Sequence, residues 1–472
     1  MIKLVKPMEI LREIEKISGS NLYVVGSGIR EHLFSNPVKR IRIMSVADPF
    51  IIAQAFSKAS ESPEISKKED GSYEVSKDEE ISFIFTLMEE DDIEAQLGRM
   101  IYSVDAVAMT VEDYIEFNES NIIDPYEGLE DIKSRILRLV RQENLIAKPI
   151  GYLRGIRLMA EHKLDIDPIT ELFMKENVEV LEGIKGEEYR KELFRILDQK
   201  ESAYYINLMD RHIGMLKYIF PEIEPMKSVG ECKYHVVDSF THSVYTLKIA
   251  EKVINTEGFF ERHIKKAYEE HMSEIMDSGI KRLSLLKLGA FFHDVGKPAA
   301  KFIDETGRTR FRGHEIVGAE ILEKMGERLG LSQRETKILA DYSKLHMFPL
   351  VIYKNNDLSG DTLYNMFSQT KRETLDILLI GYADIVSTRK LLDPEEEMGN
   401  FKVYIEYIAN NYVTRCLPIL DFESVLSYEE LKTITKKEDV EELYDTIKKE
   451  IYMGRLAMKK EKILEFIKKQ NS

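Results

Sequence analysis

The chain has 472 residues, which exceeds one ordinary domain and predicts about three of them. Its composition, 43% hydrophobic and 32% charged, is typical of a globular protein with a sizeable core. Lys and Arg number 67 against 83 Asp and Glu, a net charge of −16. Such an acidic balance argues against strong non-specific binding to nucleic acid, and we expect no DNA partner, although a local basic groove stays compatible with it.

The cysteine content and the N-terminus bear on location. Cys232 and Cys416 lie far apart and form no metal-binding spacing, so the sequence predicts no disulfide and favours a reducing cytoplasm. Charged residues interrupt the N-terminal stretch, so we expect neither a signal peptide nor a membrane span. The sequence therefore predicts a cytoplasmic protein with no membrane partner, and it leaves the oligomeric state open.

Residues 1–125 alternate between helical and strand-like patterns. Residues 7–18 predict an amphipathic helix, and a strand, a glycine turn and a helix follow from Leu22. Residues 40–45 predict a second strand, and strand-like runs recur near Tyr73 and over residues 81–87. This mixture predicts a small α/β head.

The glycine turn reads Tyr23-Val-Val-Gly-Ser-Gly-Ile-Arg-Glu and resembles the nucleotide-binding turn of the tRNA nucleotidyltransferase and poly(A) polymerase family. Two later segments are similar to the same family: Asp-Pro-Tyr-Glu-Gly-Leu-Glu-Asp from residue 124, and Gly-Tyr-Leu-Arg-Gly-Ile-Arg-Leu from residue 151. The resemblance implies that nucleotide or RNA is bound by Gly26, Gly28, Arg30, Arg154 and Arg157.

The head departs from that family most importantly at two positions. Where the family carries two aspartates that hold Mg²⁺ on the strand after the glycine turn, this chain has Arg40 and Arg42. Arginine cannot coordinate a cation and is permanently charged. We therefore expect a head that is inactive in nucleotidyl transfer. The two arginines then either bind phosphate in a nucleotide or RNA sensor, or are structural residues of a relic fold.

Residues 126–228 predict a helical neck, because apolar residues recur there at spacings of three and four. In the same family, arginines and carboxylates of the neck read the incoming base. Glu192 and Arg195 are the nearest match, three residues apart. The alternative is a salt bridge on a helix surface.

A buried helix ending in ligand-type residues is predicted near the middle of the chain. Apolar residues lead without a charge from residue 288 into His293 and Asp294, and Lys297 follows. On a helix, adjacent residues point about 100° apart, so such a pair can grip neighbouring faces of one metal centre. A purely structural His-Asp pair is the alternative. Further ligand-type residues accompany the pair: His242, His314, His346 and Asp384.

The order His, His-Asp, His, His, Asp resembles the HD-domain metal-dependent phosphohydrolases. The resemblance implies one metal held by His242, His293, Asp294 and Asp384. It implies a second held by His314 and His346, with Asp294 bridging. Asp294 and Lys297 would be catalytic, with Lys297 close to a bound phosphate. We expect two divalent ions, and the ligands alone do not choose among Mn, Fe, Co, Ni and Mg.

The sequence thus predicts an α+β multidomain protein: a small α/β nucleotidyltransferase-like head, a mostly α-helical neck, an HD-domain helical body over residues 229–410 and a helical tail over 411–472. The main functional prediction is metal-dependent hydrolysis of a phosphoester in a nucleotide, cyclic nucleotide or RNA end. One alternative is a tRNA nucleotidyltransferase or poly(A) polymerase acting on RNA 3′ ends. Another is a non-catalytic RNA- or nucleotide-binding protein.

Overall fold

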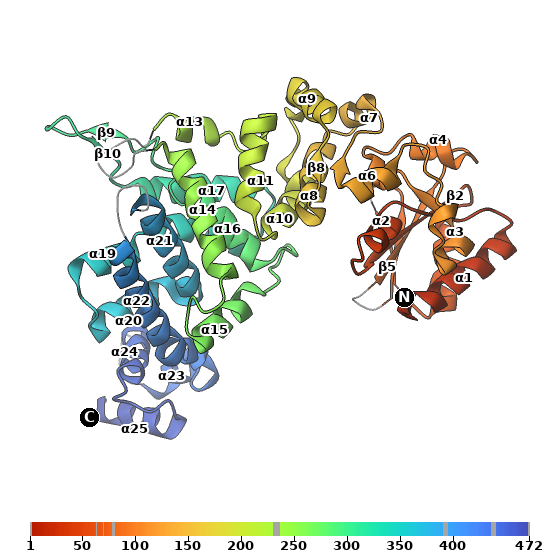
Figure 1. Ribbon diagram of the computed structural model, residues 1–472. Helices are drawn as coiled ribbons and strands as arrows, with labels where there is room; N and C mark the ends of the chain where they lie inside the picture. The colour runs from red at the N-terminus through yellow and green to blue at the C-terminus, as the bar shows by residue number, and fades with distance from the viewer. Residues whose placement is uncertain are drawn as a thin grey trace. The chain divides into compact units, whose positions relative to one another are not determined.

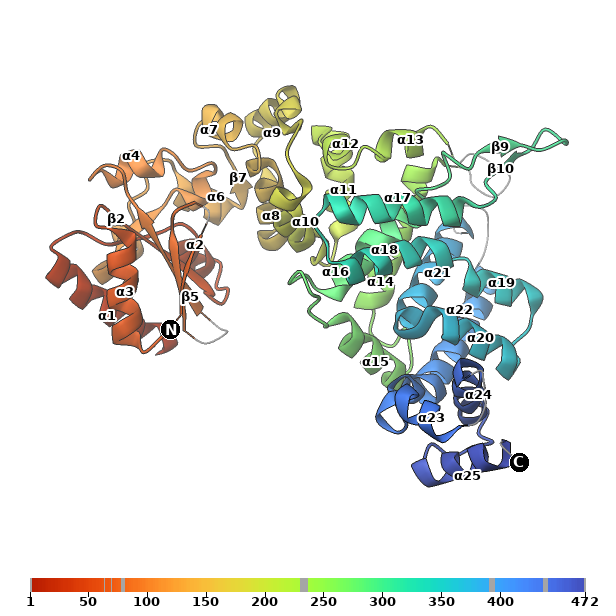
Figure 2. The ribbon, with the colours of Figure 1, turned by 180° about the vertical axis from the view of Figure 1, so that it is seen from behind.

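The computed structural model describes residues 2–62, 64–68, 70–77, 81–229, 237–389, 395–435 and 440–470. The chain forms two compact units. The first comprises Met1–Ile184 with Met209–Met215, and the second comprises Lys185–Leu208 with Leu216–Ser472. Figures 1 and 2 show the elements of both units from two sides.

The first unit begins with a six-stranded sheet. Its strands are β1 (Tyr23–Val25), β2 (Arg40–Ser45), β3 (Ile65–Lys67), β4 (Tyr73–Lys77), β5 (Ile81–Leu87) and β6 (Ala108–Thr110). Their order across the sheet is β3-β4-β5-β2-β1-β6. The β2–β5 pair is parallel and the other four pairs are antiparallel. The small α/β head that the sequence predicts is confirmed.

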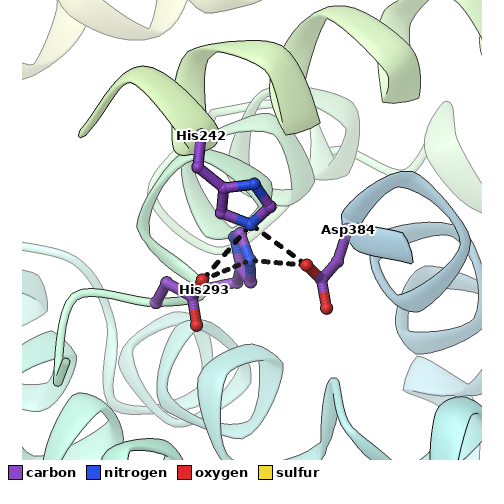
Figure 3. A group of neighbouring side chains, drawn as sticks. His242, His293 and Asp384 are labelled. Carbon is purple, nitrogen blue, oxygen red and sulfur yellow. Dashed lines mark hydrogen bonds and ion pairs between the residues drawn. The ribbon is translucent and has the colours of Figure 1, made fainter. Parts of the chain in front are cut away.

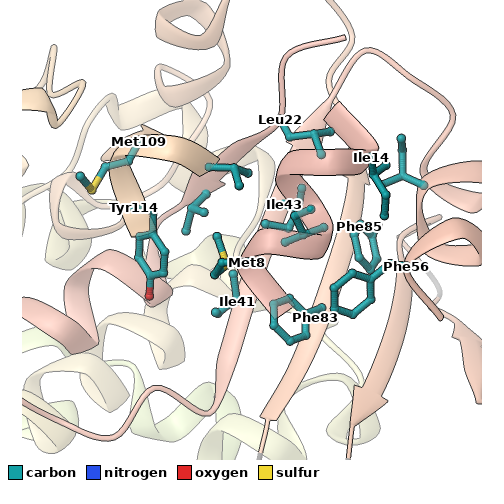
Figure 4. Packing of buried hydrophobic residues seen from close by; sticks show 14 of the residues in the cluster. Met8, Ile14, Leu22, Ile41, Ile43, Phe56, Phe83, Phe85, Met109 and Tyr114 are labelled. Atoms are coloured by element: carbon teal, nitrogen blue, oxygen red, sulfur yellow. The ribbon is translucent and has the colours of Figure 1, made fainter. Parts of the chain in front are cut away.

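One face of this sheet carries the core of the head. Ile41 and Ile43 of β2 join Phe83 and Phe85 of β5 in a buried cluster with Phe56 (Figure 4). The helices that contribute to this cluster are α1 (Ile2–Ser18), α2 (Ser27–Leu33), α3 (Pro49–Ser60) and α5 (Val111–Glu116). Because side chains alternate along a strand, the residues between the buried isoleucines point to the other face.

A helical region completes the first unit. It contains α4 (Ile93–Leu97), α6 (Gly128–Ser134), α7 (Gln142–Ala147), α8 (Gly151–His162) and α9 (Pro168–Glu176), with the short parallel pair β7 (Ile136–Leu137) and β8 (Asp165–Ile166). The carboxylate of Asp124 accepts hydrogen bonds from the backbone N–H groups of Gly128 and Leu129, at 2.7 and 2.8 Å. The motif from residue 124 therefore provides an acceptor for backbone N–H groups in the first turn of α6, which have no partner within the helix.

The second unit is helical. Its first part contains α10 (Gly186–Leu197), α11 (Ser202–Leu208), α12 (Leu216–Ile219) and α13 (Ile223–Lys227). The central helices are α14 (Ser239–Asn255), α15 (Arg262–Met272), α16 (Arg282–Phe292), α17 (His314–Arg328), α18 (Gln333–Leu345) and α21 (Thr374–Arg389). The remaining helices are α19 (Phe348–Asn355), α20 (Gly360–Thr370), α22 (Glu395–Asn411), α23 (Tyr428–Ile434), α24 (Val440–Tyr452) and α25 (Lys460–Gln470). In the described parts of the chain, no helix combines the length and apolar character needed to cross a bilayer.

The predicted fold class is confirmed, an α/β head followed by a mostly helical chain. A short hairpin precedes His314: β9 (Phe302–Ile303) pairs antiparallel with β10 (Thr309–Arg310). Within the predicted neck, Lys185–Leu208 packs with the second unit. The three boundaries between the four predicted domains stay predictions.

Candidate metal centre and candidate nucleotide-binding face

Five helices of the second unit place six ligand-type residues. His242 lies in the first turn of α14, whose N-cap Asp238 accepts a hydrogen bond from the Thr241 N–H. Asp384 lies within α21. The other helices place a histidine at an end: His293 caps the C-terminus of α16, His314 begins α17 and His346 caps α18. Helix ends allow these side chains to turn inward together.

The first group of ligand atoms lies around His242 Nε2. This atom is 3.0 Å from Asp384 Oδ1 and 3.3 Å from Asp294 Oδ2. His293 Nε2 lies 3.2 Å from the same Asp294 oxygen and 3.6 Å from Asp384 Oδ1 (Figure 3). One ligand atom from each of the four residues lies within 4.8 Å of the others. The sequence predicted this group of four.

The second group surrounds the other oxygen of Asp294. His314 Nε2 lies 3.1 Å from Asp294 Oδ1, and His346 Nε2 lies 3.9 Å from it. Asp294 thus faces both groups, one oxygen toward each, as a bridging carboxylate would. Lys297 places its ammonium 2.5 Å from Asp294 Oδ2, so in this structure it neutralises the shared carboxylate.

The histidine tautomers are set by partners on the far side of each ring. The Nδ1 atoms of His293, His314 and His346 lie 2.9, 2.9 and 2.6 Å from the backbone carbonyls three residues earlier. His242 Nδ1 lies 3.3 Å from the Ser387 hydroxyl. A proton on Nδ1 leaves the Nε2 lone pair directed into the cluster, which is the arrangement of metal-binding histidines.

These residues fit a metal because several of their buried ligand atoms have no hydrogen-bond partner. Among the described residues, the Nε2 atoms of His293, His314 and His346 are buried without a hydrogen-bond partner. Such orphaned polar atoms are costly, and a bound ion would satisfy them. Burial raises the pKa of Asp294, but the neighbouring ammonium of Lys297 holds it well below its usual range. The site therefore offers an ionised bridging carboxylate beside inward-facing imidazoles.

A close backbone approach holds the two halves of this cluster together. A Cβ on Gly296 would collide with the His314 carbonyl oxygen and the Gly318 backbone nitrogen. The Ser343 hydroxyl donates to the His293 carbonyl at 2.8 Å. The absence of a side chain on Gly296 therefore lets the Asp294 segment reach α17.

In the head, the residues of the glycine turn are built into the fold. Gly26 has φ of +68°, and its N–H donates to the Val107 carbonyl. Gly28 packs near Val24 and the Tyr114 hydroxyl. Arg30 is buried and pairs with Asp105 and, at 2.8 Å, with Glu31. The Asp105 partner lies 75 residues away, and no local sequence signal announced it.

The helical candidates lie on two elements. Arg154 and Arg157 are on α8, where the Arg157 guanidinium donates to Glu161 at 2.5 Å. Glu192 and Arg195 are on α10, which belongs to the other compact unit. Their assignment to nucleotide or RNA stays a prediction.

Arg40 and Arg42 lie on the face of the sheet opposite the main core. Three carboxylates come near them, and each is already engaged: Asp70 accepts from Ser72, Glu74 pairs with Lys68, and Asp105 pairs with Arg30. The described residues of β2 and β5 carry no carboxylate. The head therefore does not fit a pair of divalent cations held between strand aspartates.

Comparison with known families supports both of the resemblances that the sequence shows. Residues 239–388 match the HD domain. Residues 163–227 match the probable RNA and SrmB-binding site of polymerase A. The resemblance to the tRNA nucleotidyltransferase and poly(A) polymerase family, joined to an HD domain, is thereby confirmed.

The curated relatives carry names of tRNA-modifying enzymes. The A-adding tRNA nucleotidyltransferase of Deinococcus radiodurans is 26% identical over 317 residues, 66% of this chain and 63% of that protein. The CC-adding tRNA nucleotidyltransferase of Thermus thermophilus is 29% identical over 300 residues, 57% of this chain and 62% of that protein. The chain thus matches less than two thirds of the length of either relative.

The solved structures extend the likeness over the chain. A CCA-adding enzyme in an apo form has a TM-score of 0.61 at 18% identity and covers 99% of this chain and 94% of its own. The Thermotoga maritima CCA-adding enzyme complexed with tRNA has a TM-score of 0.59 at 17% identity, covering 98% and 95%. At these identities the likeness concerns the fold.

The comparisons correct the main functional prediction. Phosphoester hydrolysis by the HD body, beside an inactive head, is the wrong reading, because these relatives and structural neighbours are named for nucleotide addition to tRNA. The physical reason for the error is that a ligand set specifies which ion can bind, not which reaction follows. The nucleotidyltransferase alternative is the one that the comparisons support.

Proposed function

We propose that this chain acts on the 3′ ends of tRNA or of a tRNA-like RNA, in the manner of the nucleotidyltransferases that it resembles. The observation that carries the proposal is a shared fold over 99% of the chain with a CCA-adding enzyme. The match of residues 163–227 to a polymerase RNA-binding site supports an RNA substrate. In the first unit, the proposed nucleotide and RNA contacts are Gly26, Gly28, Arg30, Arg154 and Arg157.

A second candidate is favoured by one observation in the head. Arg40 and Arg42 stand on β2, and no carboxylate of β2 or β5 is available to hold a cation. In this candidate the chain binds the RNA end and a nucleotide but adds nothing. The two candidates share the same substrate and differ in the transfer step alone.

One experiment with two measurements tests both candidates. Full-length protein is mixed with tRNA transcripts ending before the CCA, after CC and after CCA, with labelled CTP or ATP and Mg²⁺. Incorporation supports transfer. Binding in a gel-shift assay that distinguishes the three ends, without incorporation, supports the second candidate. Absence of both incorporation and end-selective binding overturns the proposal.

We also propose that the HD body holds divalent metal through His242, His293, Asp294, His314, His346 and Asp384. The inward-facing Nε2 atoms and the ionised Asp294 support this assignment. A bound metal would supply a Lewis acid that attracts phosphate oxygens. The chain's own contribution is to hold the imidazoles through their Nδ1 partners and to place Lys297 beside Asp294.

A further inference from the structure

Arg40 and Arg42 form a pair on the face of the head sheet opposite the main core. They are two residues apart on β2, so both side chains point to the same face, about 7 Å apart along the strand. The intervening Ile41 is fully buried in the main core on the opposite face. The register of the strand is therefore fixed, and it commits both guanidinium groups to this face.

The partners of these arginines leave much of their donor capacity unused. Arg42 is largely buried, and its guanidinium donates to the neutral Thr86 hydroxyl at 3.3 Å. Among the described residues, no carboxylate oxygen lies within 4 Å of the Arg42 guanidinium nitrogens to form an ion pair. Arg40 is 46% exposed and reaches Glu74 only at 3.9 Å, while Lys68 holds that carboxylate at 2.5 Å. A guanidinium has five donors, so both can accept another ligand.

The charge around Arg42 comes from several elements. Burial lowers the pKa of Arg42, and the positive charges of Arg154 on α8 and of Arg40 lower it further. Asp70 and Asp105 act in the opposite sense. Asp105 is already paired with Arg30. Its charge is therefore only partly available to balance the three neighbouring arginines, Arg40, Arg42 and Arg154. An anion placed among them would relieve the repulsion.

We propose that Arg40 and Arg42 bind the phosphate groups of a nucleoside triphosphate directly, with no divalent cation between the protein and the phosphates. Guanidinium groups bind phosphate oxygens in a forked, charge-assisted geometry. A Mg²⁺ ion in the same place would be repelled by both arginines and would find no carboxylate on β2. The choice of a nucleotide as the ligand rests on the proposed function, whereas the cation independence rests on the arginine pair.

Calorimetric titration of the full chain tests the inference. ATP, CTP and inorganic triphosphate are titrated with EDTA present and, separately, with excess Mg²⁺. We expect ATP or CTP to bind in EDTA, and Mg²⁺ to weaken binding, because it neutralises the phosphates that the arginines recognise. Binding that requires Mg²⁺, or no nucleotide binding at millimolar concentration, overturns the inference. Binding of inorganic triphosphate alone would also overturn it, since the site would then select no nucleotide.

Variants locate the site. Arg40→Gln and Arg42→Met should each weaken nucleotide binding in EDTA at least about tenfold. Lys133→Ala is the matched control, because this exposed cation of the same unit pairs with Glu119. It should bind as the wild type does. If Arg42→Met does not fold, Arg40→Gln still decides, because Arg40 is half-exposed; unchanged binding in Arg40→Gln overturns the assignment.

A double variant reverses the expected cation dependence. Arg40→Asp with Arg42→Asp puts two carboxylates on the same face of β2, so nucleotide binding should fall in EDTA and recover with Mg²⁺ or Mn²⁺. Cation-independent binding in the folded double variant would place the nucleotide elsewhere. RNA end binding is measured in parallel. Wild-type protein that binds RNA ends but no nucleotide would overturn this inference alone, whereas loss of both end-selective RNA binding and incorporation would overturn the proposed function.

Discussion

His242 on α14 and Asp384 on α21 lie 142 residues apart in the sequence, yet His242 Nε2 is 3.0 Å from Asp384 Oδ1. The contact joins the first turn of one helix to the interior of another. Thr246 and Ser387 repeat the link one turn further along, with their hydroxyl oxygens 3.0 Å apart. The ligand geometry is thus built into the packing of α14 against α21, which means that the two helices and the metal should stabilise one another.

The first prediction concerns the bridging carboxylate. Asp294→Ala should lose most of the bound metal, because Asp294 faces both groups of histidines. His314→Ala should keep about one of two ions, because His314 faces only the second group. Metal per chain is measured by elemental analysis of purified protein, with circular dichroism to confirm folding.

A histidine outside the cluster provides the control for that series. His263→Ala removes an exposed imidazole that contacts Asn410 and Glu261, so its metal content should match the wild type. Equal metal in wild type and Asp294→Ala, or none in either, would make the cluster structural.

The second prediction concerns metal removal. Dialysis against a chelator should lower the Tm of the HD body, because it would restore three buried Nε2 atoms without partners. A ligand present at 100 times its Kd contributes about 2.7 kcal/mol to stability. Differential scanning calorimetry before and after adding back Mn²⁺ measures the effect. A Tm that responds to neither treatment would contradict a structural contribution from metal.

Local pattern accounts for what the sequence predicted correctly. The alternation around Ile41 and Ile43 places Arg40 and Arg42 on one face, and helical spacing around residues 293–346 places three histidines at helix ends. The Nδ1 partners could also have been predicted from the sequence, because a backbone carbonyl three residues earlier is a local feature of a helix end.

Contacts between distant segments account for the rest. The burial of Arg30 depends on Asp105, and the ring of His242 is oriented by Ser387, 145 residues away. No spacing rule connects such residues. The reaction itself was mispredicted because six ligand-type residues are conspicuous in a sequence and Arg40 and Arg42 stand where two aspartates were expected. Both features outweighed the resemblance to nucleotidyltransferases, which the likeness of the whole fold supports.

The third prediction concerns acid stability of the first unit. Burial raises the pKa of Glu31, but contacts with His162 and Asn36 and the charge of Arg30 outweigh it and lower the pKa from 4.5 to about 2. The lowered pKa stabilises the folded state above pH 4.5, and this contribution disappears as the pH falls toward 2. Glu31→Gln should therefore destabilise the unit by up to about 3 kcal/mol at neutral pH and by much less near pH 2. Urea unfolding at several pH values checks this; a constant difference would contradict it.

The fourth prediction concerns the close approach that seats Asp294 beside His314. Gly296→Ala should destabilise the second unit by about 2–3 kcal/mol and weaken metal binding, because the new Cβ meets backbone atoms of His314 and Gly318, which cannot rotate away. Gly399→Ala on α22 is the matched control. A Cβ there meets nothing within 4 Å, so the helix should gain about 0.5–1 kcal/mol. Thermal unfolding and metal content are compared for both variants. If Gly296→Ala is as stable and as metal-loaded as Gly399→Ala, the backbone contact does not hold the two halves of the centre together.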